Sequence, residues 1–226
     1  MESATTGSPA IADSAARADR QWFIVGRWQE YEGEARSNLL RIAAIGAFYL
    51  IELLNYHGLD FGPLQMPATV PLEFHQVVTA LAIAWIMVAL ATMVCLRAQI
   101  LPAGLKYATT LSDVVLLTTI LTVADGPRSS LVVGYFLIIV ASALRFQERL
   151  VWCSTLASMG GYLFLAGFAR WYAAPDRGLT VPRYQQLILL LALALAGITL
   201  GQVIRRVRAL AEEFSARLDA ANRERV

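Results

Sequence analysis

The chain has 226 residues, of which 57% are hydrophobic and only 16% are charged. Soluble domains usually carry about 25% charged residues, so this composition argues against a soluble protein and favours an all-α, polytopic membrane helix bundle. The net charge of +2 gives no indication of a nucleic-acid partner.

The first 38 residues precede any long apolar block. Residues 1–19 are rich in Ala, Ser and Thr, and no apolar core follows Arg17 and Arg20 as it would in a signal peptide, so we expect a disordered tail. Residues 20–38 alternate aromatic side chains such as Trp22 and Trp28 with charges, a pattern typical of an amphipathic segment at the membrane interface.

Residues 39–204 contain six apolar blocks joined by short connections. A membrane helix needs about 20 mostly apolar residues, and irregular backbone cannot face lipid, so we predict six transmembrane helices. Their expected ranges are Leu39–Tyr56, Val77–Leu96, Leu105–Ala124, Leu131–Leu144, Leu150–Trp171 and Tyr184–Ile204.

The distribution of Lys and Arg predicts the orientation. With the N-terminus inside, fifteen of the 19 basic residues lie in inner segments, and the other four are Arg128, Arg170, Arg177 and Arg183. Because cytoplasmic loops carry the excess of basic residues, both termini are expected in the cytoplasm, and the protein in the inner membrane of a bacterium.

Residues 205–226 change character after the sixth block. Ile204, Val207, Ala211, Phe214, Leu218 and Ala221 follow alternating spacings of three and four, which favours a short cytoplasmic coiled coil. The expected interface residues are Val207, Phe214 and Leu218, and the partner is a second copy or a separate cytoplasmic signalling protein. A solitary amphipathic helix is the alternative.

Two acidic residues lie inside predicted spans, Glu52 in the first and Asp113 in the third. Ionisable side chains are costly inside a membrane, so each is a candidate functional residue. They lie at different depths, so we do not expect them to pair directly. Asp113 is instead expected to meet nearby threonines or water, and Asp113→Asn to be tolerated where Asp113→Lys is not.

The two histidines, His57 and His75, lie at the outer ends of the first two spans, where they could meet near Glu52, Glu73 and Asp125. Three functions are compatible with such a cluster: a divalent metal site, axial ligation of a haem, or a proton-responsive group. Histidines near the headgroups without any ligand role are the fourth reading.

No catalytic motif is present: the sequence has no phosphate-binding glycine loop, no H-E-x-x-H pattern and no plausible Ser-His-acid set, so no enzyme is expected. Cys95 and Cys153 lie in apolar blocks outside any C-x-x-C pair, which predicts neither a disulfide nor a thiolate metal site. Gly197 and Gly201 form a G-x-x-x-G pattern suited to close helix packing or dimerisation.

The stretch from Asp113 to Phe146, DVVLLTTILTVADGPRSSLVVGYFLIIVASALRF, resembles the middle of the six-span sensor regions of bacterial membrane histidine kinases and related nucleotide cyclases. Redox-responsive kinases of this kind carry a G-G-x-x-N-P-F turn associated with quinone, and the matching residues 125–131 keep only the second glycine, Gly126. We expect no phosphoacceptor region, ATP-binding domain or cyclase fold, the output domains of that family, after Phe214.

The resemblance and the exit helix together favour a membrane sensor that relays a signal through its C-terminal helix. Two other classes remain open on the sequence alone. One is a small transporter or a haem- or metal-binding redox subunit that uses Asp113, Glu52 and the histidines. The other is a structural subunit of a larger membrane complex.

Overall fold

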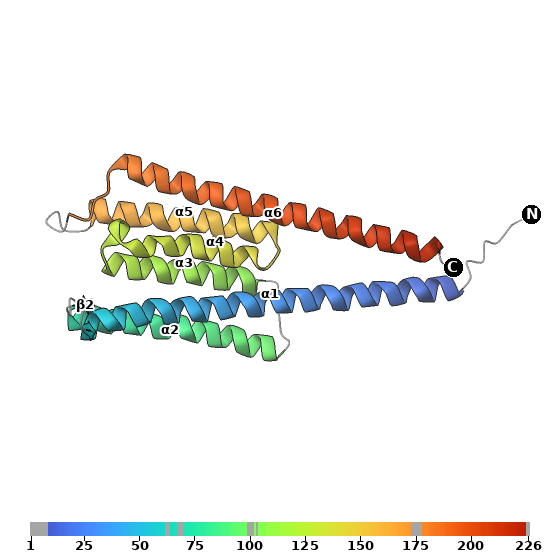
Figure 1. The fold of residues 1–226 in the computed structure, drawn as a ribbon, viewed down its shortest axis with the longest axis horizontal. Helices are drawn as coiled ribbons and strands as arrows, with labels where there is room; N and C mark the ends of the chain where they lie inside the picture. The colour runs from blue at the N-terminus through green and yellow to red at the C-terminus, as the bar shows by residue number, and fades with distance from the viewer. Residues whose placement is uncertain are drawn as a thin grey trace, which may run out of the picture.

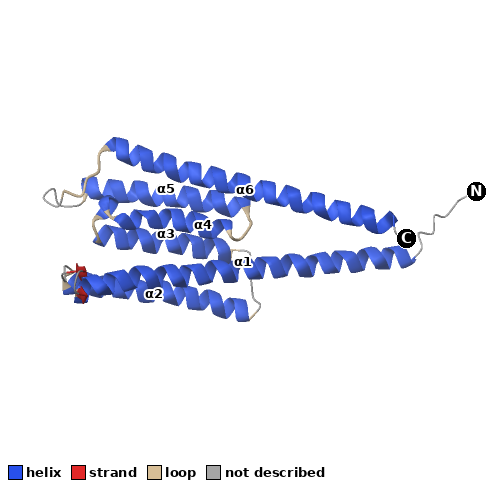
Figure 2. Ribbon diagram, in the orientation of Figure 1, coloured by secondary structure: helices blue, strands red, loops and turns tan. Residues whose placement is uncertain are grey.

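A computed structural model describes residues 9–61, 64–66, 70–98, 102, 104–172 and 178–224. Six α-helices account for most of these residues and lie side by side in one elongated bundle (Figure 1, Figure 2). Their bounds are α1 Pro9–His57, α2 Leu72–Arg97, α3 Leu105–Val123, α4 Gly134–Ala143, α5 Glu148–Trp171 and α6 Arg183–Glu224.

Four segments are long and apolar enough to cross a membrane. They are Tyr31–His57 of α1, Leu72–Arg97 of α2, Glu148–Trp171 of α5 and Arg183–Arg217 of α6. These four helices confirm the prediction of a helical protein with segments able to span a membrane. The predicted count of six spans is not confirmed. The third and fourth predicted blocks do form helices. However, α3 carries Lys106, Asp113 and several threonines, and the apolar helix at Ser130–Ala143 is shorter than a span.

The N-terminal segments differ from the sequence-based expectation. Helix α1 begins at Pro9 and runs without a break to His57, so residues 9–19 are helical, whereas residues 1–8 lie outside the described part. Five alanines between Pro9 and Asp19 account for this, because alanine has the highest helix propensity. No backbone break separates the expected interfacial segment, residues 20–38, from the first apolar block.

Short turns connect the helices at the end of the bundle away from the two termini. After α1, Gly58 adopts a positive φ of 72° and leads into an antiparallel hairpin of β1 (Leu59–Phe61) and β2 (Leu64–Met66), with Leu59 paired to Met66. After α3, Gly126 has a φ of 60° and starts two 3₁₀ turns, Gly126–Arg128 and Ser130–Val133, that lead into α4. A residue with a side chain is strained at such angles, which explains both glycines.

The apolar core lies between α3, α4, α5 and α6. Its largest fully buried side chains include Tyr135 and Tyr162, and two pairs of polar side chains within it are hydrogen-bonded. The Tyr135 hydroxyl lies 2.8 Å from Thr118 Oγ1, and Ser142 Oγ lies 2.7 Å from Ser154 Oγ. These hydrogen bonds join α3 to α4 and α4 to α5, so they fix the helices of the core relative to one another.

Glycine allows α6 to approach α5 closely. A Cβ atom added at Gly197 would lie 2.3 Å from Thr155 Oγ1, which no side chain can tolerate without movement. The nearest atom to a Cβ at Gly201 is Trp152 Nε1, also on α5, at 3.9 Å. Both glycines of the G-x-x-x-G pattern therefore face α5 of the same chain, and the motif serves packing inside the bundle.

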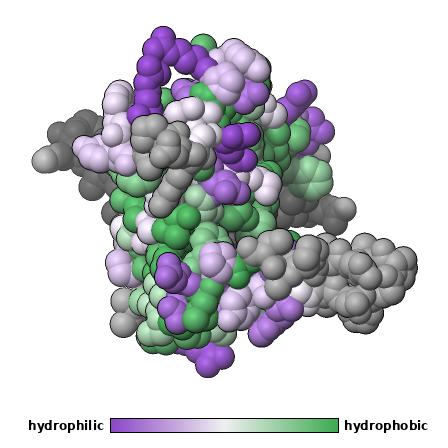
Figure 3. Space-filling model, turned by 90° about the vertical axis from the view of Figure 1, so that its left-hand side faces the viewer, coloured by the Kyte–Doolittle hydropathy of each residue, from purple (hydrophilic) through white to green (hydrophobic). Residues whose placement is uncertain are grey.

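The outer faces of the helices are apolar. Exposed side chains include Met87 and Val94 on α2, Leu156 and Phe164 on α5, and Leu187 on α6. A soluble protein would bury such continuous faces, so they are the surfaces that lipid would cover. At the end of the bundle that carries the hairpin and the connection before α6, hydrophilic and hydrophobic residues lie side by side (Figure 3).

Helices α1 and α6 extend beyond the bundle at the same end (Figure 1). In α6, Ile204 is the last buried residue among those whose side chains are described, and Val207, Leu210 and Phe214 are 43%, 60% and 68% exposed. The helix continues without a break to Glu224. Leu218 lies in this helix, but its side chain falls outside the described part of the chain.

Candidate functional site

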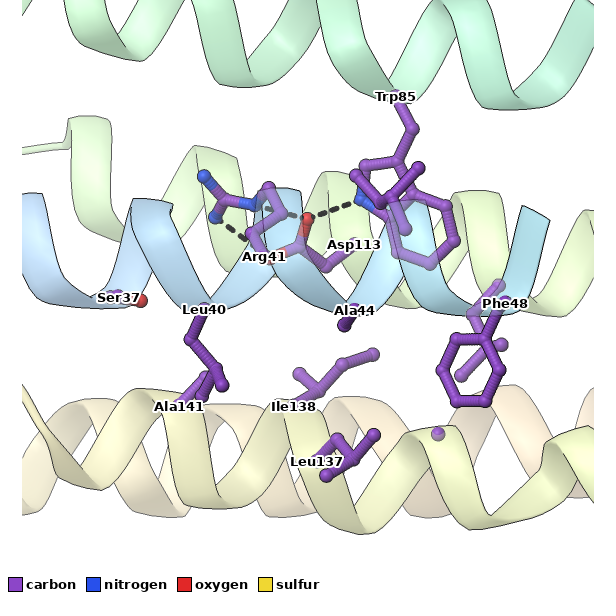
Figure 4. A pocket seen from close by; sticks show the side chains of 13 residues that line it. Ser37, Leu40, Arg41, Ala44, Phe48, Trp85, Asp113, Leu137, Ile138 and Ala141 are labelled. Atoms are coloured by element: carbon purple, nitrogen blue, oxygen red, sulfur yellow. Dashed lines mark hydrogen bonds and ion pairs between the residues drawn. The ribbon is translucent and has the colours of Figure 1, made fainter. Parts of the chain in front are cut away.

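An ion pair joins α1 to α3 beside a small cavity between the helices (Figure 4). Arg41 Nε and Nη2 donate to Asp113 Oδ1 and Oδ2 over 2.7 and 2.8 Å, and Trp85 Nε1 of α2 donates to Asp113 Oδ1 over 2.7 Å. The Arg41 side chain is 4% exposed and that of Asp113 is 11% exposed. A two-point pair of this kind fixes orientation as well as charge, so Asp113 holds three helices together.

The network continues along α1 through Asn38. Its Oδ1 accepts a hydrogen bond of 2.8 Å from Arg41 Nη1, and its Nδ2 donates to the carbonyl of Ala89 on α2 over 3.1 Å. Glu34, Ser37, Asn38 and Arg41 are all buried, and their spacing of three, one and three places them on one face of α1. This polar face packs against the other helices, while Tyr31 and Arg36 in the same stretch of α1 are exposed.

A second buried ion pair lies toward the end where α1 and α6 leave the bundle. Arg145, in the turn between α4 and α5, donates to Glu34 Oε1 over 2.7 Å and to Thr110 Oγ1 over 2.7 Å. It also donates to the carbonyl of Lys106 over 3.0 Å. Burial lowers the pKa of the Arg145 guanidinium, and the Glu34 carboxylate opposes that change by stabilising the charged form.

The turn at Arg145 and Phe146 also touches α6. Phe146 has a φ of 49°, a left-handed conformation that is uncommon for a residue with a side chain, and its carbonyl accepts a hydrogen bond from Arg208 Nη2. On the α1 side, a Cβ at Gly33 would lie 3.3 Å from the backbone of Arg145. One strained turn, which we call the α4–α5 turn, thus contacts both helices that leave the bundle.

A third polar cluster lies at the opposite end of the bundle. His75 Nδ1 of α2 lies 2.9 Å from Glu52 Oε1 of α1, and the His75 ring stacks on Tyr56 with centroids 4.0 Å apart. Glu52 Oε2 is buried and has no hydrogen-bond partner among the described residues. One predicted pairing of a histidine with a carboxylate is therefore present in the structure.

A cavity of about 400 Å³ opens next to this cluster, between α1 and α2 on one side and α3 with the following 3₁₀ turns on the other. Glu52 and Asp125 both line it, and the aromatic lining residues are Phe48, Tyr49, Phe74 and Trp85. A smaller cavity of about 50 Å³ adjoins Arg41 and Asp113, and it shares Phe48 and Trp85 with the larger one (Figure 4). Trp85 thus connects the large cavity to the central ion pair.

The remaining predicted site residues do not converge on one point. His57 is exposed and meets Tyr56 edge-on with centroids 5.0 Å apart, and Glu73 is exposed at the start of α2. Asp125 is exposed, and it shares with Glu52 of the Glu52–His75 pair only the lining of the large cavity. Within the described residues, no group of three or more His, Cys, Asp and Glu side chains is arranged to hold a metal ion.

Sequence reasoning missed three residues of the buried ion pairs, Glu34, Arg41 and Arg145. Arg41 and Arg145 counted only toward orientation, yet each forms a buried ion pair. The polar residues of α1 recur at intervals of three or four positions, a helical period that could have identified the polar face of α1 from the sequence. They are Glu34, Ser37, Asn38 and Arg41.

These features define the class: a helical membrane protein with charged networks buried between its helices and a cavity at one end. Comparison with family models, with curated proteins and with solved structures gives no match.

Proposed function

We propose that this chain is a membrane sensor module that relays a signal through α6 to a cytoplasmic partner. The observation that carries the proposal is the exit of α6 from the bundle. Beyond Ile204 it extends about 30 Å as a continuous helix, and its apolar residues Val207, Leu210 and Phe214 find no cover among the described residues of the chain. An exposed apolar face of this kind suits a coiled coil with a second copy or with another protein.

The proposed input is the large cavity, and the proposed coupling element is the α4–α5 turn. The turn joins Glu34 of α1 and Arg208 of α6 through Arg145 and Phe146. A displacement of α1 relative to α3 and α4 would therefore act on α6 at the point where that helix leaves the bundle. Such small helix shifts at a two-state contact are an established way to transmit a signal.

The relay can be tested by disulfide cross-linking between copies at Phe214→Cys, in membranes and in a background without Cys95 and Cys153. Glu34→Gln weakens the Arg145 contact and is expected to change the rate of cross-linking. The matched control is Glu32→Gln, which alters an exposed carboxylate on the same helix. Equal cross-linking rates in the Phe214→Cys protein and in its Glu34→Gln and Glu32→Gln derivatives would contradict a relay through the α4–α5 turn.

We further propose that all six helices cross the membrane, with both termini in the cytoplasm. Helices α3 and α4 run along the other four in the bundle (Figure 1), and four or six spans would equally bring both ends to one side. Labelling of Arg128→Cys by a membrane-impermeant thiol reagent separates the two counts. Six spans place position 128 outside, whereas four spans place it inside. Reporters after Val226 and before Gln21 are expected in the cytoplasm, and reporters at Pro67 and Asp176 outside.

A small transporter is the second candidate, and the large cavity is the observation that favours it. The two buried carboxylates do not face one common path, because Asp113 is held by Arg41 and Trp85 while Glu52 is held by His75. Uptake measurements in vesicles with a cavity ligand would distinguish transport from binding alone.

A further inference from the structure

The charge of the large cavity is one-sided. Its ionisable lining residues are Glu52 and Asp125, and no Lys, Arg or His lines it among the described residues. Most of the remaining lining is apolar or aromatic. The chemistry of the walls therefore favours an occupant that combines positive charge with an apolar body.

The buried carboxylate of Glu52 indicates where the charge would lie. Its Oε1 is engaged by His75, while its Oε2 is buried and unpaired among the described residues. A buried carboxylate oxygen without a hydrogen bond is unfavourable, and a donor supplied by a ligand would remove that cost. A protonated amine satisfies the oxygen through a charge-assisted hydrogen bond, which is stronger than a neutral one.

The aromatic lining suits the same ligand class. Phe48, Tyr49, Phe74 and Trp85 come from α1 and α2 and line the cavity. Aromatic faces attract organic cations, most strongly in desolvated sites. The cavity volume of about 400 Å³ also falls in the range of roughly 300–1,000 Å³ that small-molecule sites occupy.

We infer that the cavity binds a small organic cation, an amine on an aromatic or otherwise apolar body, with its ammonium group on the Glu52 carboxylate, which turns its buried Oε2 toward the cavity to accept the hydrogen bond. The inference rests on the proposed function in one respect, because it identifies this ligand class as the stimulus of the sensor. Trp85 would report occupancy to the centre of the bundle, since it lines the cavity and also donates to Asp113.

The test uses the full chain in lipid nanodiscs and two probes, 2-(2-naphthyl)ethylamine and its N-acetyl derivative, with binding measured by calorimetry. The amine is expected to bind and the neutral amide to bind more weakly. Glu52→Gln should weaken amine binding about tenfold or more, corresponding to loss of a charge-assisted contact, and should leave amide binding unchanged. The matched control Glu73→Gln removes an exposed carboxylate that does not line the cavity, and it should bind both probes as the parent does.

Ala82→Leu supplies a second variant, because Ala82 is buried on α2 and lines the cavity. The added side chain should reduce binding of both probes. The inference is overturned if the parent does not bind the amine, if it binds amide and amine equally, or if Ala82→Leu leaves amine binding unchanged. It is also overturned if Glu73→Gln weakens amine binding as much as Glu52→Gln does.

Failure of this inference is distinguishable from failure of the proposed function. Amine binding that leaves cross-linking at Phe214→Cys unchanged would support the ligand class and contradict the relay. A cross-linking response to Glu34→Gln without amine binding would support the relay and contradict the ligand class.

Discussion

Replacing Asp113 by Asn should destabilise the bundle strongly, although the change keeps the size of the side chain. It leaves the Arg41 guanidinium buried without a countercharge, since the other acceptor it contacts through Nη1 is the neutral Asn38. Removal of one partner from a buried ion pair typically costs about 3–5 kcal/mol. This reverses the expectation from the sequence, in which Asp113 had no cationic partner and an amide could replace it.

The measurement is reversible unfolding in mixed detergent micelles, followed by circular dichroism. A double variant, Arg41→Met with Asp113→Leu, removes both charges and should be more stable than Asp113→Asn, because no unpaired charge remains. The control Glu32→Gln breaks an exposed pair with Arg36 on α1 and should change the unfolding free energy by less than about 1 kcal/mol. A loss below about 1 kcal/mol for Asp113→Asn would refute the buried pair.

Two further predictions concern the core. Gly197→Leu should separate α6 from α5 by forcing a side chain into Thr155, and it should lower the unfolding free energy by about 1–3 kcal/mol. The control Gly160→Leu places its side chain in open space and should leave stability unchanged. Equal stability of the two variants would contradict the close contact. Tyr135→Phe removes the hydrogen bond to Thr118 and should lower the unfolding free energy by about 1 kcal/mol; an unchanged value would show that this hydrogen bond contributes nothing to stability.

The sequence predicted the positions of the helices well because apolar blocks of span length leave the backbone few alternatives. Four of the six predicted blocks lie within α1, α2, α5 and α6. The third and fourth run one residue past the ends of α3 and α4, and the fourth begins in the 3₁₀ turn Ser130–Val133. The continuous N-terminal helix was missed because alanine-rich stretches outside an apolar block carry no hydrophobic signal. Helix propensity is the signal that indicates a helix there.

The candidate site was predicted only in part. Glu52 and His75 pair as the spacing of the two outer helix ends suggested, but the partners of Asp113 could not be found from its own helix. Arg41 lies 72 positions away in the sequence, and pairing at that separation depends on which helices become neighbours. Small residues such as Gly33 and Gly197 allow close approach to Arg145 and Thr155, and the local sequence around each glycine does not indicate which neighbour it meets.

The most direct test of the central claim is the pattern of disulfide cross-linking along the exit helix in native membranes. Single cysteines at Val207, Phe214 and Leu218 should cross-link two copies efficiently, and cysteines at Glu212 and Arg217 should do so less, because only the first set follows the predicted seam. Cross-linking that varies with this spacing supports signal output through an α6 coiled coil between copies. Equal cross-linking at all five positions, or none at any, would contradict a homodimer through α6.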